Sequence, residues 1–119
     1  PSFGTDGAIE TPRDDREAGP DRARKIMTDG AWLYVGGVTH PAPRHESTWT
    51  IDRRSLTDGS LNPHFGNGGR IAFDLVQGEE VVTDMLFAPD QVSLFVSGVT
   101  GTDAAKFGSS QWRLERRSR

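Results

Sequence analysis

The side chains best suited to chemistry lie in a proline-rich stretch, HPAPRHES, at residues 40–47. His40, His45 and Glu46 are residue types that bind transition metals such as zinc. Two histidines five residues apart in a loop have no fixed geometry, however, unlike ligands spaced along a helix or strand. We therefore interpret the stretch as a solvated loop, and we expect neither a metal ion nor a cofactor.

Acidic residues gather in two connections between apolar runs, where they could offer oxygen ligands to calcium. They are Asp14, Asp15, Glu17, Asp21, Glu79 and Glu80. Neither group has the regular D-x-[DN]-x-[DN]-G spacing of a calcium-binding loop. Runs of like charge are usually solvated, so we expect solvated linkers at both places.

The chain contains no catalytic signature that we can name. It has no G-x-S-x-G motif, no Ser-Lys pattern and no evident pair of catalytic carboxylates. His64 stands where the matching N-terminal phrase has Ser2, so the position needs no titrating ring. The string GNGG at 66–69 does not fit a phosphate loop, because those motifs open a helix and a β run follows here. We assign no catalytic residue and lean against an enzyme.

Composition excludes several classes of protein. The 119 residues carry a formal net charge of −3, with 14 glycines and no cysteine. Such a weak charge does not fit a basic nucleic-acid binder, and the terminal RLERRSR is better explained by cross-strand ion pairs with Asp52 and Glu115. No apolar run reaches the roughly 18 residues of a membrane span. The many glycines indicate turns and short elements, as in all-β chains.

Three phrases occur twice at a nearly constant offset, which is the signature of a repeat architecture. The pairs are PSFGTDGAI and PHFGNGGRI (1–9 and 63–71), LYVGGVT and LFVSGVT (33–39 and 94–100), and WTIDRRS and WRLERRS (49–55 and 112–118). We therefore divide the chain, a single domain segment, into repeats at about 1–62 and 63–119. Six aromatic residues also occur in matched pairs, so we expect these six to pack between neighbouring sheets. They are Phe3 and Phe65, Tyr34 and Phe95, and Trp49 and Trp112.

Apolar and polar residues alternate over short runs bounded by Gly, Pro, Asp and Asn, which predicts β-strands. The predicted strands are 8–11, 23–27, 31–39 and 48–55 in the first repeat, and 70–75, 81–88, 92–100 and 111–117 in the second. Four strands in each repeat match the four-stranded blade of a β-propeller. The predicted fold is all-β, with two four-stranded antiparallel propeller blades that form part of a closed ring.

The phrases DGAWLYVGG and DGSLNPHFGNGGRI resemble the delta-60 repeat family of bacterial β-propeller proteins, and the resemblance covers essentially the whole chain. The usual family phrase is D-G-x-L-D-x-x-F-G-x-x-G. This sequence departs from it at Asn62, where the family has Asp, and its second repeat has Ser97 where the first has Gly36. The resemblance implies a propeller fold in a bacterial protein, often secreted or attached to the cell surface. It implies no common enzymatic activity.

The turn phrase should place strand 70–75 beside strand 48–55, so the repeats are permuted relative to the blades. The strand at 8–11 then belongs to a preceding blade, and the last three strands lack a fourth. Propellers typically hold 4 to 8 blades, so we expect the other blades to come from copies of this chain, as an oligomer, or from a longer parent chain. Strand 8–11 is expected to pair with strand 111–117, either within the same closed assembly or in an adjoining chain.

We expect a non-catalytic interaction or scaffold module that binds a protein or a glycan through loops between strands. Two long inserts join corresponding strands, and they carry the predicted ligand-binding residues Arg44, His45, Asp103 and Lys106. The alternative is part of a propeller enzyme whose site lies at the central channel. Inner strands would place Arg24, Lys25, Thr83 or Asp84 near that channel.

Overall fold

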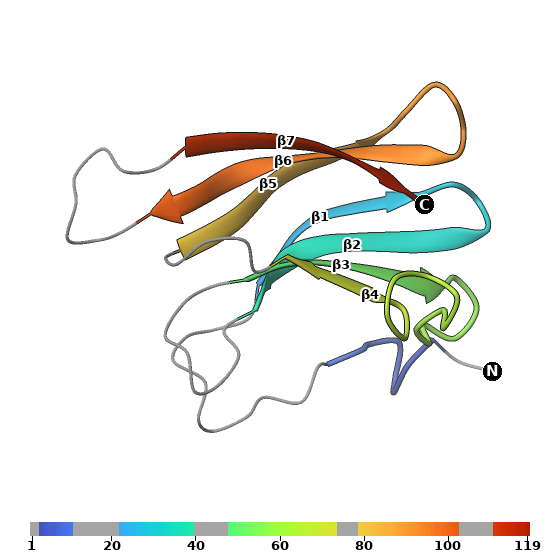
Figure 1. Ribbon diagram of the computed structural model, residues 1–119. Helices are drawn as coiled ribbons and strands as arrows, with labels where there is room; N and C mark the ends of the chain where they lie inside the picture. The colour runs from blue at the N-terminus through green and yellow to red at the C-terminus, as the bar shows by residue number, and fades with distance from the viewer. Residues whose placement is uncertain (1–2, 11–21, 40–47, 74–78, 103–110) are drawn as a thin grey trace.

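The computed structural model describes residues 3–10, 22–39, 48–73, 79–102 and 111–119 (Figure 1). These residues form seven β-strands and contain no helix. The strands are β1 (Arg22–Thr28), β2 (Trp32–Thr39), β3 (Thr48–Ser55), β4 (Arg70–Phe73), β5 (Glu79–Phe87), β6 (Ser93–Thr102) and β7 (Gln111–Ser118). The predicted all-β class is confirmed.

The strands belong to two antiparallel sheets. The first sheet has the order β1-β2-β3-β4 and the second has the order β5-β6-β7. As expected from the turn phrase, β4 pairs beside β3, with Ile71 opposite Ile51. The second sheet has three strands in the described part of the chain, as expected for permuted repeats whose last three strands lack a fourth. The fourth strand of the first sheet comes from the next repeat along the chain, and no such repeat follows β7 within these 119 residues. Two sheets do not close a ring, so the propeller stays a prediction.

The predicted strand at 8–11 does not form in the residues that the structure describes. Thr5 and Ala8 instead make an isolated bridge that closes a tight turn. The backbone N–H of Gly4 donates a hydrogen bond to the carbonyl oxygen of Asp58, 3.0 Å away. A strand needs a neighbour for its backbone donors and acceptors, and no described strand pairs with residues 8–10.

The N-terminal segment, residues 3–10, packs on the first sheet and does not lie beside β7 of the same chain, so its pairing with β7 of an adjoining chain stays a prediction. It lies on the side of that sheet away from the second sheet (Figure 1). Phe3 and Ile9 approach Gly59 so closely that a Cβ atom there would lie 1.9 Å from Ile9 Cδ1. Ile9 therefore finds apolar cover within the first sheet's own turns.

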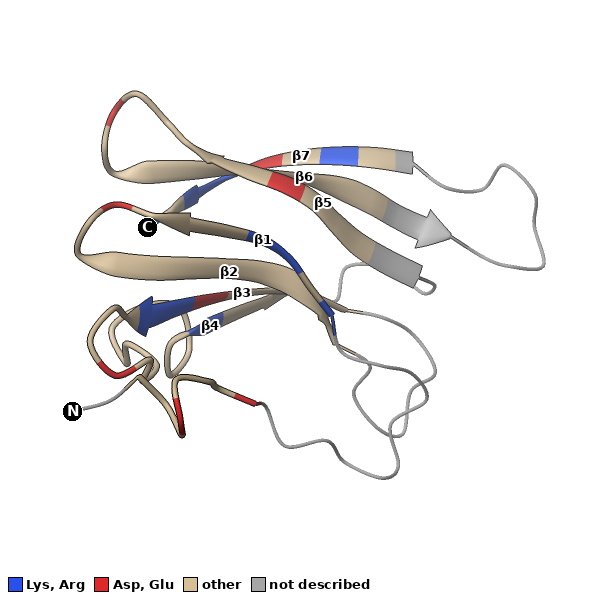
Figure 2. Cartoon of the chain, turned by 180° about the vertical axis from the view of Figure 1, so that it is seen from behind, with Lys and Arg blue, Asp and Glu red and all other residues tan. Residues whose placement is uncertain are grey.

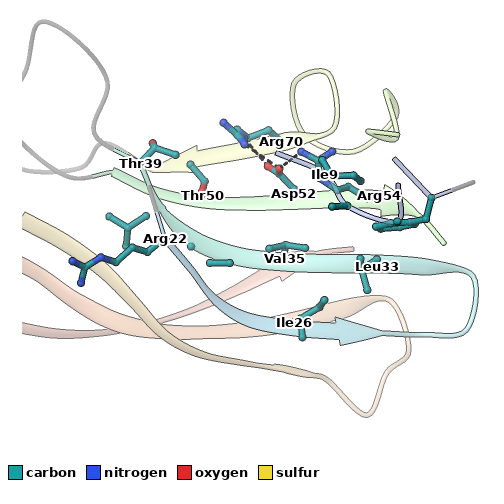
Figure 3. A pocket seen from close by; sticks show the side chains of 16 residues that line it. Ile9, Arg22, Ile26, Leu33, Val35, Thr39, Thr50, Asp52, Arg54 and Arg70 are labelled. Atoms are coloured by element: carbon teal, nitrogen blue, oxygen red, sulfur yellow. Dashed lines mark hydrogen bonds and ion pairs between the residues drawn. The ribbon is translucent and has the colours of Figure 1, made fainter. Parts of the chain in front are cut away.

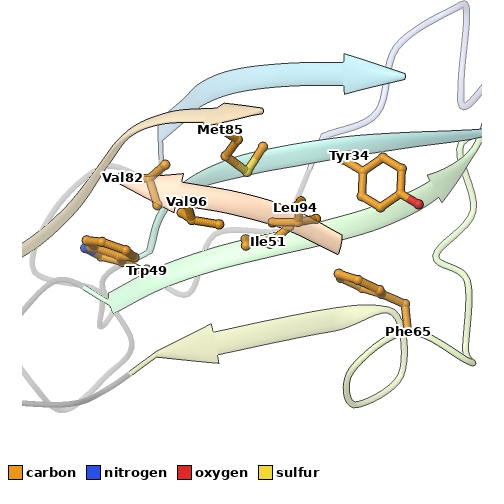
Figure 4. Close-up of a cluster of buried hydrophobic side chains, with 8 residues drawn as sticks. All are labelled: Tyr34, Trp49, Ile51, Phe65, Val82, Met85, Leu94 and Val96. Carbon is orange, nitrogen blue, oxygen red and sulfur yellow. The ribbon is translucent and has the colours of Figure 1, made fainter. Parts of the chain in front are cut away.

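The core lies between the two sheets (Figure 4). Its buried side chains are Tyr34, Trp49, Ile51, Phe65, Val82, Met85, Leu94 and Val96. Tyr34 meets the rings of Phe65 and Phe87 edge to face, with centroids 6.0 and 5.3 Å away. Trp49 lies over Gly98, where a Cβ atom would come within 2.2 Å of the indole ring. Side chains of alternate residues thus interdigitate as in aligned sheet packing.

The turn phrase has the same conformation in both repeats. Gly4 and Gly66 have φ angles of 56° and 55°, and Asp6 and Gly68 follow at 53° and 63°. Each turn is closed by one bridge. The bridged pairs are Thr5 with Ala8 and Asn67 with Arg70. The repeated sequence therefore encodes a repeated left-handed turn, in which glycine avoids the steric cost of positive φ.

Of the six paired aromatic residues, Tyr34, Trp49 and Phe65 belong to the core between the two sheets, whereas Phe3, Phe95 and Trp112 do not, so the prediction is wrong for these three. Trp49 is fully buried, whereas Trp112, its counterpart in the second repeat, is 83% exposed. Both occupy the same position in the repeated phrase, but Trp112 lies on the outer face of the second sheet. No described residue covers it there.

Candidate functional site

The four predicted ligand-binding residues, Arg44, His45, Asp103 and Lys106, lie outside the described residues. The strand ends that carry them are described. In the first sheet Thr39 pairs with Thr48, and in the second sheet Thr100 pairs with Gln111.

Trp49 links these two strand ends across the sheets. Its indole Nε1–H donates a hydrogen bond to the carbonyl oxygen of Val99, at 3.3 Å. Val99 stands one residue before Thr100, and Trp49 stands one residue after Thr48. Both inserts therefore start from neighbouring places at one end of the molecule.

Lys25 and Asp84, two of the four residues expected at the channel, are brought together. Lys25 Nζ lies 2.9 Å from Asp84 Oδ1, between the edge strands β1 and β5. The Lys25 ammonium, followed by the backbone N–H of Met85, lowers the pKa of Asp84 from its usual value. Thr83 instead donates its hydroxyl to the Ser97 carbonyl oxygen, at 3.2 Å. A carboxylate paired with a lysine is a weak candidate for an acid or a base.

Most of the expected ion pairs run along a strand, not across strands. Figure 2 shows Lys and Arg on β1, β3, β4 and β7. Glu115 pairs with Arg113 and Arg117, each two residues away on the same strand. Residues two apart on a strand share one face, which explains these contacts. Asp52 also reaches across to Arg70 on the neighbouring strand β4, and Arg116 on β7 reaches Asp90 in the β5–β6 hairpin.

The buried carboxylate of Asp52 pairs with two arginines on the first sheet. Its Oδ1 accepts a hydrogen bond from Arg70 Nε at 2.5 Å, and its Oδ2 accepts bonds from Arg54 and from Arg70, each at 2.9 Å. Two guanidinium groups thus neutralise one carboxylate. The arrangement satisfies a buried charge and leaves little free chemistry.

A hollow of about 320 Å³ opens beside this cluster, on the outer face of the first sheet (Figure 3). Its apolar lining includes Ala23, Ile26, Leu33 and Val35. Ile26 is a large apolar residue, yet its side chain is 62% exposed in this hollow. Sequence reasoning did not predict this hollow. The signal was present, since Leu33 and Val35 fall in a phrase whose second copy supplies two core residues, Leu94 and Val96.

A second apolar surface covers the outer face of the other sheet. Its exposed residues are Leu86 on β5 and Trp112 and Leu114 on β7. Leu114 is 60% exposed. Large apolar side chains that gather on one face commonly mark a site of association. In the described part of the chain, each sheet thus has an apolar outer face on which no other sheet packs, and we call these the two unpartnered faces; the N-terminal segment borders the one on the first sheet.

Metal binding finds no candidate in the described part of the chain, where no three His, Asp or Glu side chains cluster. The residues considered for zinc and most of those considered for calcium lie outside that part, and of Glu79 and Glu80 only the backbone is described. Among the described residues there is also no helix that could span a membrane.

No protein-family model, curated protein or solved structure matches the chain. The delta-60 resemblance therefore stays a prediction, carried by the repeated phrases.

Proposed function

We propose that the chain is a non-catalytic interaction or scaffold module of the β-propeller type, in which each sheet is a blade. Its ligand is a protein or a glycan, held by the two inserts that carry Arg44, His45, Asp103 and Lys106. The remaining blades come from further copies or from a longer parent chain. The delta-60 resemblance supports a secreted or surface-attached bacterial setting.

One observation carries the proposal: both inserts start from adjoining strand ends. The hydrogen bond from Trp49 to Val99 joins the N-terminal end of β3 to the C-terminal half of β6. A rigid pair of sheets that projects two loops from one end is a common way to build a recognition surface. Guanidinium, imidazole, carboxylate and ammonium groups in those loops suit polar ligands.

The alternative of a channel enzyme has less support. The edge strands β1 and β5 bring Lys25 and Asp84 into contact, so each neutralises the other. Catalysis needs acid, base or metal ligands that converge with shifted proton affinities. The pKa of Asp84 is shifted downward, which suits a structural ion pair.

Alanine substitution of the four insert residues tests the proposal. Binding of the wild-type chain is first measured on printed arrays of glycans and of peptides. The variants are then tested on the glycans and peptides that the wild type binds. The quadruple variant should lose at least about tenfold in affinity, equivalent to roughly 1.4 kcal/mol, and should melt as the wild type does. Thr57→Ala/His64→Ala, at exposed turn residues beyond the other end of β3, is the matched control. Unchanged binding would contradict the proposal. A lower melting temperature would contradict it too, because it would show that the four residues stabilise the fold.

A further inference from the structure

The two unpartnered faces correspond, residue by residue, to the two faces already packed together inside the chain. Strand register gives the match: Ile26 pairs with Val35 in the first sheet, as Met85 pairs with Val96 in the second. Both sheets also carry a bulge just before this position. The two sheets are therefore equivalent strand by strand and face by face.

The hollowed face of the first sheet corresponds to the buried face of the second. Val82, Met85, Leu94 and Val96 fill the core from the second sheet. Their counterparts in the first sheet are Ala23, Ile26, Leu33 and Val35, which line the hollow. The hollow thus presents the side chains that a repeat uses to pack on the sheet before it.

The exposed face of the second sheet corresponds to the buried face of the first. Trp49 and Ile51 are fully buried between the sheets, and Trp112 and Leu114 are their counterparts. Within the chain, Trp49 packs over Gly98. The counterpart of Gly98 is Gly37, which lines the hollow and where a Cβ atom would first meet the backbone of Arg22 and Ala23.

We infer that a second copy of this chain docks head to tail, with Trp112 of one copy packed over Gly37 of the next. The contact would repeat the arrangement of Trp49 over Gly98. Such a contact is heterologous, so it joins two different faces and can propagate until a ring closes. This inference rests on the proposed blade architecture, but not on the proposed ligand.

Charge at the sheet edges favours the same order. Lys25 and Asp84 stand at corresponding positions and pair across the internal contact. Head-to-tail docking would place Lys25 of the next copy on the other side of Asp84, so that opposite charges alternate along the edge. Pairing of two identical Trp112 faces would leave both hollows empty.

The N-terminal segment is compatible with this docking. Phe3 corresponds to Phe65, which packs at the turn end of the internal contact against Tyr34. Phe3 lies at the turn end of the hollow, beside Gly59. The segment therefore occupies the place of a preceding repeat's turn, and head-to-tail docking would bring residues 8–10 beside the edge of β7 in the other copy.

Sedimentation velocity from nanomolar to high micromolar concentration tests the inference, using the chain alone without any ligand. The wild type should form particles of two or more chains. Trp112→Glu and Ile26→Glu each place a charge on one of the two faces and should remain monomeric. Val92→Glu, an equally exposed apolar residue in the β5–β6 hairpin, is the control and should assemble as the wild type does. Thermal melting at nanomolar concentration shows whether each variant is folded, and Trp112→Ser replaces Trp112→Glu if the latter is not.

Mixing the two variants separates head-to-tail docking from other modes. The Ile26→Glu chain keeps its Trp112 face and the Trp112→Glu chain keeps its hollow, so an equimolar mixture should form a dimer with one chain of each. A monomeric wild type at every concentration would overturn the inference. So would an Ile26→Glu variant that assembles normally, because that result indicates pairing of identical faces. Since no ligand is present, a failure to assemble does not affect the proposed ligand binding. Likewise, a failure to bind on the arrays does not affect the proposed docking.

Discussion

At the scale of residues, two aspartates close equivalent hairpins. Asp29 accepts hydrogen bonds from the backbone N–H groups of Ala31 and Trp32, at 2.9 and 2.8 Å. Asp90 accepts them from Val92 and Ser93, at 3.0 and 2.9 Å. An ionised carboxylate forms stronger hydrogen bonds with these donors than a protonated one. Both turns should therefore depend on the charge of their aspartate.

Acid should weaken the fold in part through Asp90. The Ser93 hydroxyl, the Val92 N–H and Arg116 hold the pKa of Asp90 well below its usual value. A carboxylate with a lowered pKa in the folded state stabilises fully above its unfolded pKa, near about 4, and loses that contribution as the pH falls through the folded pKa. The free energy of unfolding in urea should thus decrease from about pH 5 to about pH 2.

The variant Asp90→Asn should be less stable than the wild type near neutral pH and should lose less stability in acid. Ser93→Ala removes one donor but keeps the charge, so its acid dependence should be intermediate. Urea unfolding at several pH values measures both effects. An Asp90→Asn variant with the same acid dependence as the wild type would show that other carboxylates account for the whole effect.

At the scale of elements, strand positions were predictable because they depend on local patterns. The strand at 48–55 was predicted with its observed bounds. Burial was less predictable, since it depends on which sheet lies opposite. Trp49 and Trp112 share one phrase but differ fully in exposure. Residues 8–10 show why a sequence pattern alone is not enough. Their alternating pattern predicts a strand, but no described strand pairs with them.

The repeated turn offers a prediction at this scale. Gly66 and Gly68 both have positive φ, so alanine at either position should cost about 1 kcal/mol from backbone strain. A Cβ at Gly66 would also lie 2.4 Å from the Arg70 carbonyl oxygen, whereas nothing lies within 4 Å of one at Gly68. Gly66→Ala should therefore cost an additional 1–3 kcal/mol or so.

Gly68→Asp is the informative control for the turn, because Asp6 already holds the equivalent position at a φ of 53°. It should cost less than Gly68→Ala, since aspartate tolerates left-handed backbone better than most residues. Urea unfolding of the three variants measures the order. Equal losses for Gly66→Ala and Gly68→Ala would mean that the turn relaxes around the added methyl group.

At the scale of the whole molecule, stability depends on the sheet faces that are buried in the core, and assembly depends on the faces that are not. The repeat pattern alone does not tell which face of a sheet is which. The sequence marks each sheet with two apolar faces. Only the packing shows that one face of each sheet is used internally, while the other face meets no second sheet in the described part of the chain. The N-terminal segment covers a part of one of them. Its effect on the fold can therefore be separated from its effect on association.

Deletion of residues 1–12 should lower the free energy of unfolding even in dilute solution. Phe3 and Ile9 are half-buried against the turn at Gly59, and the Gly4 N–H bond to Asp58 is lost with them. Removing this cover should cost about 1–3 kcal/mol at the rate of roughly 25 cal/mol per Å² of apolar area. Phe3→Ala/Ile9→Ala should reproduce most of the loss, because the two side chains provide most of the apolar contact. Light scattering on the truncated chain then reports association. A reduced particle mass is expected, because residues 8–10 can no longer approach β7 of a neighbouring copy, whereas an unchanged mass and an unchanged melting transition would show that the segment contributes to neither.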